Sequence, residues 1–256
     1  MKQRVLLVLG PHRSGSSLVA NALTAIAGAK LPEGANWTGP DNKRGFGEPP
    51  AMIPLNDRIL SVLDRTWDNP CPLPVGFERH PALDYGLFPD ARALLRIIVG
   101  DNALTVVKEP RMTRLLPFWR RVIESCDLDV MAVRTVRHPA ESARSLEKRR
   151  NGIPFEQGLA LWLEHVRCCR QHIPAEWRQT SILYDRMVEL PRYAVERAAG
   201  ELRLPFDPAA LREFCREFLD KSLRHEQADE EVELPAEVAV VWKLERARAA
   251  RGYGDA

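Results

Sequence analysis

The strongest indication of the fold lies in residues 4–17, which read Arg4-Val-Leu-Leu-Val-Leu-Gly-Pro-His-Arg-Ser-Gly-Ser-Ser17. The first half is a short apolar run that ends in glycine, the pattern of a strand buried on both faces of a parallel sheet. After a polar turn, apolar residues recur at Leu18, Ala22 and Ile26, which is the spacing of one face of a helix. The sequence therefore predicts an opening unit of strand, tight loop and helix.

The rest of the chain alternates between strand and helix patterns. Buried-strand patterns follow at 104–108, 130–137 and 181–184. Helical patterns lie at 90–99, 117–125, 139–149 and 155–172, and in the C-terminal part at 192–202, 208–219 and 235–248. Strands that alternate with helices predict a three-layer α/β sandwich around a central, mostly parallel sheet. The C-terminal part, 192–256, is expected to be helical.

We interpret residues 1–256 as a single domain with one unusual region. Ten of the twenty prolines fall within 32–89, where the only helical pattern covers 54–63. In open α/β folds, irregular connections beyond the carboxyl ends of the strands tend to form the ligand crevice. The region 32–89 is therefore expected to form a ligand pocket or its lid.

The composition excludes several classes of protein. Lys and Arg number 37 against 35 Asp and Glu, a formal charge of +2, so neither nucleic acid nor an anionic membrane is the expected partner. The five cysteines contain no C-x-x-C pair, which argues against a zinc site and a disulfide framework. No apolar run is long enough to span a membrane. We expect a cytoplasmic protein, and the sequence does not indicate its oligomeric state.

The loop 10–17 has the composition of an anion-binding loop between a strand and a helix. Compared with the phosphate loop G-x-x-x-x-G-K-[ST], both glycines and Ser17 are in register, but Ser16 stands at the lysine position. Arg13 supplies a cation within the loop instead, and its guanidinium can bridge anionic oxygens. The alternative is that Ser14 and Ser16 only cap the helix while Arg13 points into solvent.

A second cluster completes a two-part pattern. In the segment 134–146, a predicted strand ends at Arg137. A turn at a proline follows, and then a predicted helix that carries Ser145, eight residues after the arginine. With the loop 11–17, this segment resembles the family of sulfotransferases that use 3′-phosphoadenylyl sulfate (PAPS), in its bacterial or Golgi-like variant with Arg-Ser-Gly in the loop. The resemblance implies a P-loop-like nucleotide-binding fold, with the 5′ side of PAPS and its 3′-phosphate held by two residue sets. These are Arg13, Ser14, Gly15, Ser16 and Ser17 for the 5′ side, and Arg137 and Ser145 for the 3′-phosphate.

Two further segments extend the resemblance to about residue 191. Val106-Val-Lys-Glu-Pro-Arg111 is similar to a strand-end Lys-Asp-Pro segment of bacterial and tyrosylprotein sulfotransferases. The segment 182–188 resembles the family's Tyr-Glu-x-Leu segment, which implies that Tyr184 lies near the nucleotide. The family's C-terminal Arg-Lys-Gly element corresponds at best to Arg251-Gly252.

The resemblance implies transfer of a sulfonate group from PAPS to a hydroxyl of a small-molecule or carbohydrate-like acceptor, by in-line displacement and without a metal. Adenosine 3′,5′-bisphosphate is then the second product. The reaction needs cations where charge develops on the leaving group. Arg13 and Lys108 are expected to supply them, because both lie at ends of predicted parallel strands and should border the same crevice. The alternative for Lys108 is a surface ion pair with its neighbour Glu109.

The proton of the acceptor hydroxyl needs a base. We favour Glu48, in the Gly/Pro segment just before the predicted helix at 54–63, with Glu109 and His12 as alternatives. General-base catalysis of this kind typically contributes ~10²- to 10⁴-fold.

Two rival functions share the same fold. A P-loop kinase or NTPase would need the loop lysine that is replaced here by Ser16. A non-catalytic module would bind the nucleotide without transferring its sulfonate group.

Overall fold

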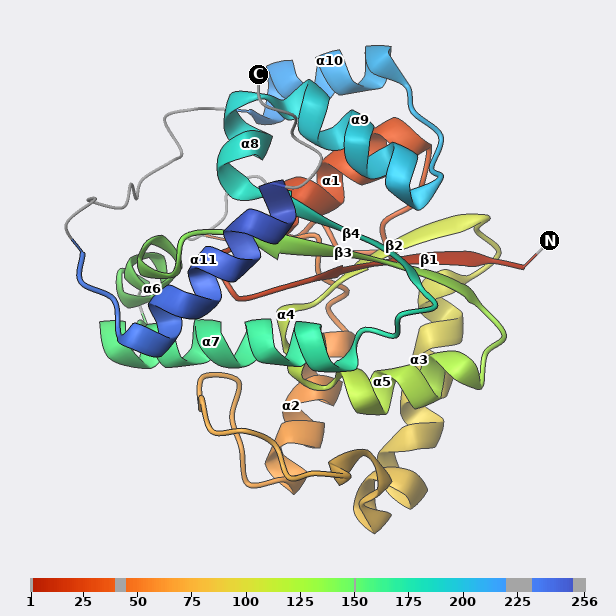
Figure 1. Ribbon diagram of the computed structural model, residues 1–256. Helices are drawn as coiled ribbons and strands as arrows, with labels where there is room; N and C mark the ends of the chain where they lie inside the picture. The colour runs from red at the N-terminus through yellow and green to blue at the C-terminus, as the bar shows by residue number, and fades with distance from the viewer. Residues whose placement is uncertain (1, 40–44, 150, 220–231, 251–256) are drawn as a thin grey trace.

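The computed structural model describes residues 2–39, 45–149, 151–219 and 232–250 of the chain. Within these residues, four strands form one sheet, in the order β2-β1-β3-β4, and every pair of neighbours is parallel (Figure 1). The strands are β1 (Arg4–Leu9), β2 (Leu104–Lys108), β3 (Asp129–Val136) and β4 (Arg178–Leu183). The prediction of a mostly parallel sheet is confirmed.

Strand β4 begins three residues before its predicted start at Ser181. Its first two residues, Arg178 and Gln179, are not buried, whereas the remaining four are. Because β4 is an edge strand that begins with polar residues, its first part is not a continuous apolar run, which is the pattern that predicts a buried strand.

One face of the sheet is covered by four helices that pack on the side chains of Leu6, Val8 and Ile182. Figure 1 shows these helices above the sheet. They are α1 (Ser16–Ala27), α8 (Tyr184–Glu189), α9 (Pro191–Leu202) and α10 (Pro208–Phe218).

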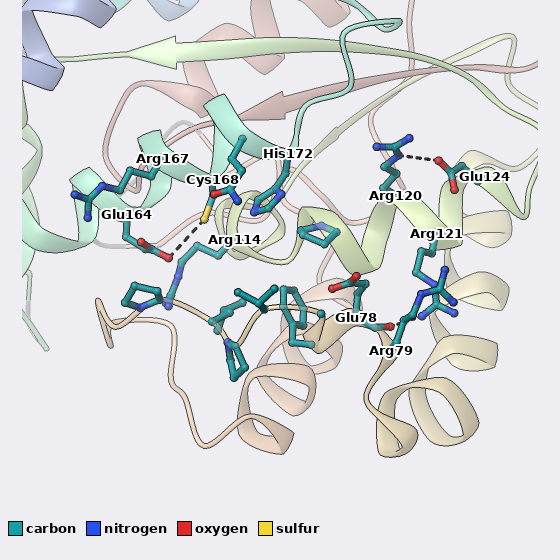
Figure 2. A pocket seen from close by; sticks show the side chains of 18 residues that line it. Glu78, Arg79, Arg114, Arg120, Arg121, Glu124, Glu164, Arg167, Cys168 and His172 are labelled. Carbon is teal, nitrogen blue, oxygen red and sulfur yellow. Dashed lines mark hydrogen bonds and ion pairs between the residues drawn. The ribbon is translucent and has the colours of Figure 1, made fainter.

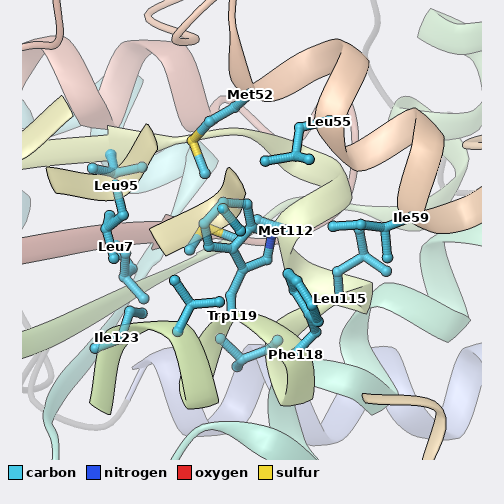
Figure 3. Packing of buried hydrophobic residues seen from close by; sticks show 14 of the residues in the cluster. Leu7, Met52, Leu55, Ile59, Leu95, Met112, Leu115, Phe118, Trp119 and Ile123 are labelled. Atoms are coloured by element: carbon cyan, nitrogen blue, oxygen red, sulfur yellow. The ribbon is translucent and has the colours of Figure 1, made fainter. Parts of the chain in front are cut away.

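The other face carries a larger apolar core, which is shown in Figure 3. Trp119 lies fully buried at its centre, and its indole Nε1 donates to Oδ1 of Asn56 at 2.8 Å, so the one polar atom of the ring is satisfied. The helices on this side are α2 (Met52–Val62), α3 (Phe88–Val99), α4 (Pro110–Arg114), α5 (Leu116–Glu124) and α7 (Phe155–His172).

Two helices remain, α6 (Pro139–Glu147), which follows β3 and packs on α7, and α11 (Ala236–Ala250), which packs against β3 and β4. Buried Glu245 of α11 accepts a hydrogen bond from Arg134 of β3 at 3.1 Å, which ties the C-terminal helix to the sheet. Helices thus cover both faces of a parallel sheet, and the predicted three-layer α/β sandwich with a helical C-terminal part is confirmed.

The region 32–89 has little regular structure, as the prolines predict. Among its described residues, 32–39 and 45–89, the helical elements besides α2 and the start of α3 are one 3₁₀ turn (η1, Phe77–Arg79) and one π-helical turn (η2, Leu83–Leu87). The sequence pattern does not predict α4 and α8, because each helix is less than two turns long and starts at a strand end, where no helical period can develop.

Candidate active site

The candidate site lies at the carboxyl edge of the sheet. Lys108 is the last residue of β2, and the loop 10–17, Arg137 and Tyr184 directly follow β1, β3 and β4. Because the four strands are parallel, these residues meet at one edge, where ligands bind in open α/β folds.

The loop after β1 has an unusual backbone that its glycines permit. Gly10, Arg13 and Gly15 have φ values of 145°, 63° and 85°, and α1 begins at the next residue, Ser16. A Cβ atom on Gly15 would lie 2.4 Å from Cδ2 of Tyr184, so both the backbone angle and the neighbouring ring require glycine at this position.

Hydrogen bonds to two other strand ends hold the loop in place. The backbone N–H of Gly10 donates to Oγ1 of Thr113 at 3.0 Å, just beyond β2. The buried hydroxyl of Ser14 donates to the carbonyl of Pro11 at 2.7 Å and forms a second hydrogen bond with the hydroxyl of Thr135 in β3. The loop is therefore anchored from both sides of β1.

The serines of the loop do not cap the helix, contrary to the alternative considered from the sequence. The N-cap position is Gly15, and no side chain accepts a hydrogen bond from the first turn of α1. Ser14 bonds within the loop, and Ser17 donates to the carbonyl of Phe46 at 2.8 Å. The N-terminal N–H groups of α1 thus keep their capacity to bind an anion.

Arg13 joins the two motifs that the sequence placed far apart. Its Nε donates to Oγ of Ser145 at 2.9 Å, and its backbone carbonyl accepts a hydrogen bond from Nη1 of Arg137 at 3.0 Å. Arg13, Gly15 and Ser145 are each only partly buried. The structure therefore brings the first loop and the second cluster together.

Arg137 is held in a defined orientation. Its Nε donates to Oε2 of Glu141 at 2.8 Å, one helical turn further on, and both side chains are buried. Its guanidinium carbon lies 4.3 Å from the centre of the Tyr184 ring, a cation–π contact. The carbonyl of Arg137 accepts a hydrogen bond from the indole of Trp162 at 3.1 Å, so α7 also fixes this strand end.

Lys108 forms a buried ion pair with Glu48. Nζ of Lys108 lies 2.5 Å from Oε1 of Glu48, with side-chain exposures of 2% and 11%. Burial lowers the pKa of Lys108, and the Glu48 carboxylate opposes this shift. The alternative for Lys108, a surface pair with Glu109, is therefore wrong.

The segment before α2 brings Glu48 to Lys108. The backbone N–H of Glu48 donates to the carbonyl of Ala35 at 3.0 Å, and its carbonyl accepts from the indole of Trp37 at 3.1 Å. Trp37 stacks on Phe46 with ring centres 4.0 Å apart. Together with the bond from Ser17 to Phe46, these contacts fold the segment onto the anion loop.

Glu109 is less suited to act as a base. Its carboxylate is fully buried and accepts hydrogen bonds from Asn56 and, at 2.6 Å, from Arg111. Burial raises the pKa of Glu109. Both carboxylate oxygens already accept a hydrogen bond from a protein donor, and these bonds stabilise the ionised form, so Glu109 has less tendency to take a substrate proton.

His12 is enclosed by aromatic rings. Its ring centre lies 5.0 Å from that of Trp67 and 5.3 Å from that of His165, which is fully buried. Burial, and then the neighbouring His165, lower the pKa of His12 well below its usual value. This ring packs the loop against α7 and the segment around Trp67.

The structure adds residues that the sequence analysis did not identify. Thr113 and Thr135 hold the loop, and Trp162 and Glu141 hold Arg137. The spacing of Glu141, four residues after Arg137 on a predicted helix, was a signal for their contact. The two threonines gave none, because each lies more than a hundred residues from its partner in the loop. Arg251-Gly252 lies outside the described residues.

No family model matches the chain, and no curated protein is similar to it in sequence. Solved structures do share its fold. The sulfotransferase domain from the curacin biosynthetic pathway is 16% identical with a TM-score of 0.59, over 95% of this chain and 98% of that domain. The sulfotransferase domain of the Synechococcus PCC 7002 olefin synthase is 20% identical with a TM-score of 0.54, over 96% of each chain. The chain therefore has the fold of these sulfotransferase domains.

Gly15→Ala tests whether the Tyr184 ring closes the space beside the loop. We expect a loss of ~1–3 kcal/mol in the free energy of unfolding, because backbone strain adds to the clash. Gly28→Ala is the matched control, since Gly28 also has a positive φ, of 59°, but nothing lies within 4 Å of the place that its new methyl group would take. Denaturant unfolding that shows equal losses for both variants would contradict the predicted contact.

The two buried histidines predict an acid-sensitive fold. The pKa of His165 is about 3, because burial disfavours its charged form, against an ordinary value of 6.5. Between these values the unfolded chain binds more protons than the native protein, so stability falls as the pH drops below 6.5. The slope is up to ~1.4 kcal/mol per pH unit for each such histidine.

Denaturant unfolding between pH 6.5 and 5 measures this slope. We expect it to be shallower in His165→Phe than in the parent protein. The same slope in the parent protein and in His165→Phe would show that His165 does not titrate in this way.

Proposed function

We propose that this protein transfers the sulfonate group of PAPS to a hydroxyl of a small-molecule or carbohydrate-like acceptor. The observation that carries the proposal is the junction of Arg13 with Ser145 and Arg137, which unites the two motifs that resemble the PAPS site. The fold shared with two sulfotransferase domains supports the same chemistry.

In this proposal the nucleotide bridges the two motifs. The loop residues Arg13 to Ser17 and the uncapped N-terminus of α1 bind the 5′-phosphosulfate, because convergent N–H groups and a guanidinium suit an anion. Arg137 and Ser145 bind the 3′-phosphate. Tyr184 contributes by holding both Gly15 and the guanidinium of Arg137 in position.

Transfer then proceeds by in-line displacement at sulfur. The acceptor oxygen forms a bond to sulfur while the bond from sulfur to the bridging phosphate oxygen breaks, and adenosine 3′,5′-bisphosphate leaves with the electron pair. Lys108 and Arg13 stabilise the charge on that oxygen, and Glu48 takes the proton of the hydroxyl. No metal takes part in this scheme.

The ion pair between Lys108 and Glu48 couples the two halves of this step. While Glu48 is ionised, its charge is balanced by the ammonium group 2.5 Å away. Once Glu48 has accepted the proton it is neutral, and the charge of Lys108 then acts on the leaving oxygen instead. Glu48 and Lys108 thus exchange their contact with each other for new partners during the reaction: Glu48 takes the proton of the hydroxyl, and Lys108 stabilises the leaving oxygen.

Arg137→Ala tests the nucleotide site. Losing charge-assisted hydrogen bonds to a phosphate costs ~1.5–3 kcal/mol, so we expect adenosine 3′,5′-bisphosphate to bind ~10- to 100-fold more weakly in calorimetric titrations. Arg212→Ala, which removes an exposed arginine from α10, is the control and should bind like the parent protein. Unchanged affinity in Arg137→Ala would rule out the proposed 3′-phosphate site.

Glu48→Gln and Lys108→Met test the catalytic pair. We expect each to lower turnover by ~10²- to 10⁴-fold, because one removes the base and the other the cation beside it. Affinity for adenosine 3′,5′-bisphosphate should stay within about threefold in both variants, since a role in transfer acts mainly on the transition state. The measurement follows radiolabelled PAPS with the best acceptor from a screen of hydroxyl compounds. Full turnover of Glu48→Gln at saturating acceptor would exclude Glu48 as the base.

A further inference from the structure

A groove outside the candidate active site is lined by three parts of the chain. These are the segment 72–79, helix α5 from Pro117 to Glu124, and the C-terminal half of α7, with Arg114 between them. We call it the α5–α7 groove; Figure 2 shows its side chains. Its volume of about 630 Å³ lies within the range of ~300–1,000 Å³ that is typical of small-ligand pockets. Its lining includes none of the residues assigned above to the nucleotide or to transfer.

A buried carboxylate faces this groove without a strong partner. Glu164 is only 6% exposed, yet the one described donor to it is the thiol of Cys168, at 3.6 Å. The nearby guanidinium of Arg114 is turned to other acceptors, because Nη1 and Nη2 donate to the carbonyls of Asn69 and Cys71 at 2.7 Å each. A thiol is a weak donor, so Glu164 can accept hydrogen bonds from a ligand.

The groove also offers a donor. The guanidinium of exposed Arg79 makes no hydrogen bond or ion pair with any residue that the structure describes. Arg121, beside it in Figure 2, is already bonded to Asp84 at 2.7 Å. Acceptors and donors therefore line the same hollow, and a hydroxyl group can use both, because it donates one hydrogen bond and accepts others.

One wall of the groove is apolar and rigid. The segment 72–77 reads Pro-Leu-Pro-Val-Gly-Phe, with Val75 fully exposed. The prolines restrict the backbone of this wall, and the two bonds from Arg114 hold Asn69 and Cys71 directly before it. A sugar ring matches such a groove, because it has an apolar C–H face and an edge of hydroxyl groups.

We propose that the α5–α7 groove binds a saccharide, and that this saccharide is the acceptor. The second statement rests on the proposed function. Two parts of the chain connect the groove with the candidate active site. Helix α4 links Lys108 to Arg114, and the groove wall continues through residues 69–71 to Trp67, which packs on His12 of the anion loop. An oligosaccharide that runs along this wall presents a hydroxyl to the transfer site.

The test is binding of maltotriose, cellotriose and chitotriose, with trialanine as a peptide control, by saturation-transfer NMR and calorimetry. We expect at least one trisaccharide to bind with a Kd below about 1 mM. Its affinity should fall at least tenfold in Glu164→Ala and in Arg79→Ala. Since Arg79 is exposed, its variant tests the groove even if Glu164→Ala fails to fold. Arg212→Ala is again the matched control.

Each result has a distinct meaning when adenosine 3′,5′-bisphosphate is titrated in parallel. No trisaccharide binding, or binding that both groove variants retain, overturns the saccharide site while the proposed function stands. Trialanine binding that depends on Arg79 shows a peptide site and also overturns it. Trisaccharide binding without bisphosphate binding upholds the groove but contradicts its role in sulfonate transfer. If a bound trisaccharide is not sulfated with PAPS present, it is not the acceptor.

Discussion

The two hydrogen bonds at Arg13 join the parts of this protein on which its function depends. Through its side chain Arg13 reaches Ser145 on α6, and through its carbonyl it receives Arg137 from the end of β3. Arg13 is thereby held in one cluster with Arg137, which lies 124 positions further along the chain, and with Ser145, which lies 132 positions further along. Arg13 itself has a left-handed backbone, and Gly10 and Gly15 on either side accommodate the other positive φ angles of the loop.

The charges near this junction are arranged so that buried groups have partners. Lys108 is paired with Glu48, Arg137 with Glu141, and Arg111 with Glu109. Removing one member of such a pair leaves an uncompensated buried charge, whereas a ligand anion can take over the role of a carboxylate. The paired state is therefore a rigid resting arrangement from which the proposed reaction starts. The α5–α7 groove differs, because Glu164 is buried there with only a thiol donor among the described residues.

The sequence was sufficient for the architecture and for the neighbourhood of the site. The apolar run 4–9, and the residues that end each later strand, determine which side chains reach the carboxyl edge, since a parallel sheet places all strand ends together. It was not sufficient for contacts between distant segments. The pairing of Lys108 with Glu48 depends on how the proline-rich segment folds back through Trp37 and Phe46, and no local pattern encodes that path. The single-domain boundary, the cytoplasmic location and the roles of the site residues stay predictions.

We propose that the joined motifs form a site for a nucleotide with a 3′-phosphate. Calorimetric titration of the full chain with adenosine 3′,5′-bisphosphate and, separately, with ATP, each with and without Mg²⁺, tests it most directly. We expect micromolar binding of the bisphosphate that does not depend on Mg²⁺, and little binding of ATP. Tight Mg²⁺-dependent binding of ATP without a response to the bisphosphate would contradict it, and would favour a phosphotransferase instead.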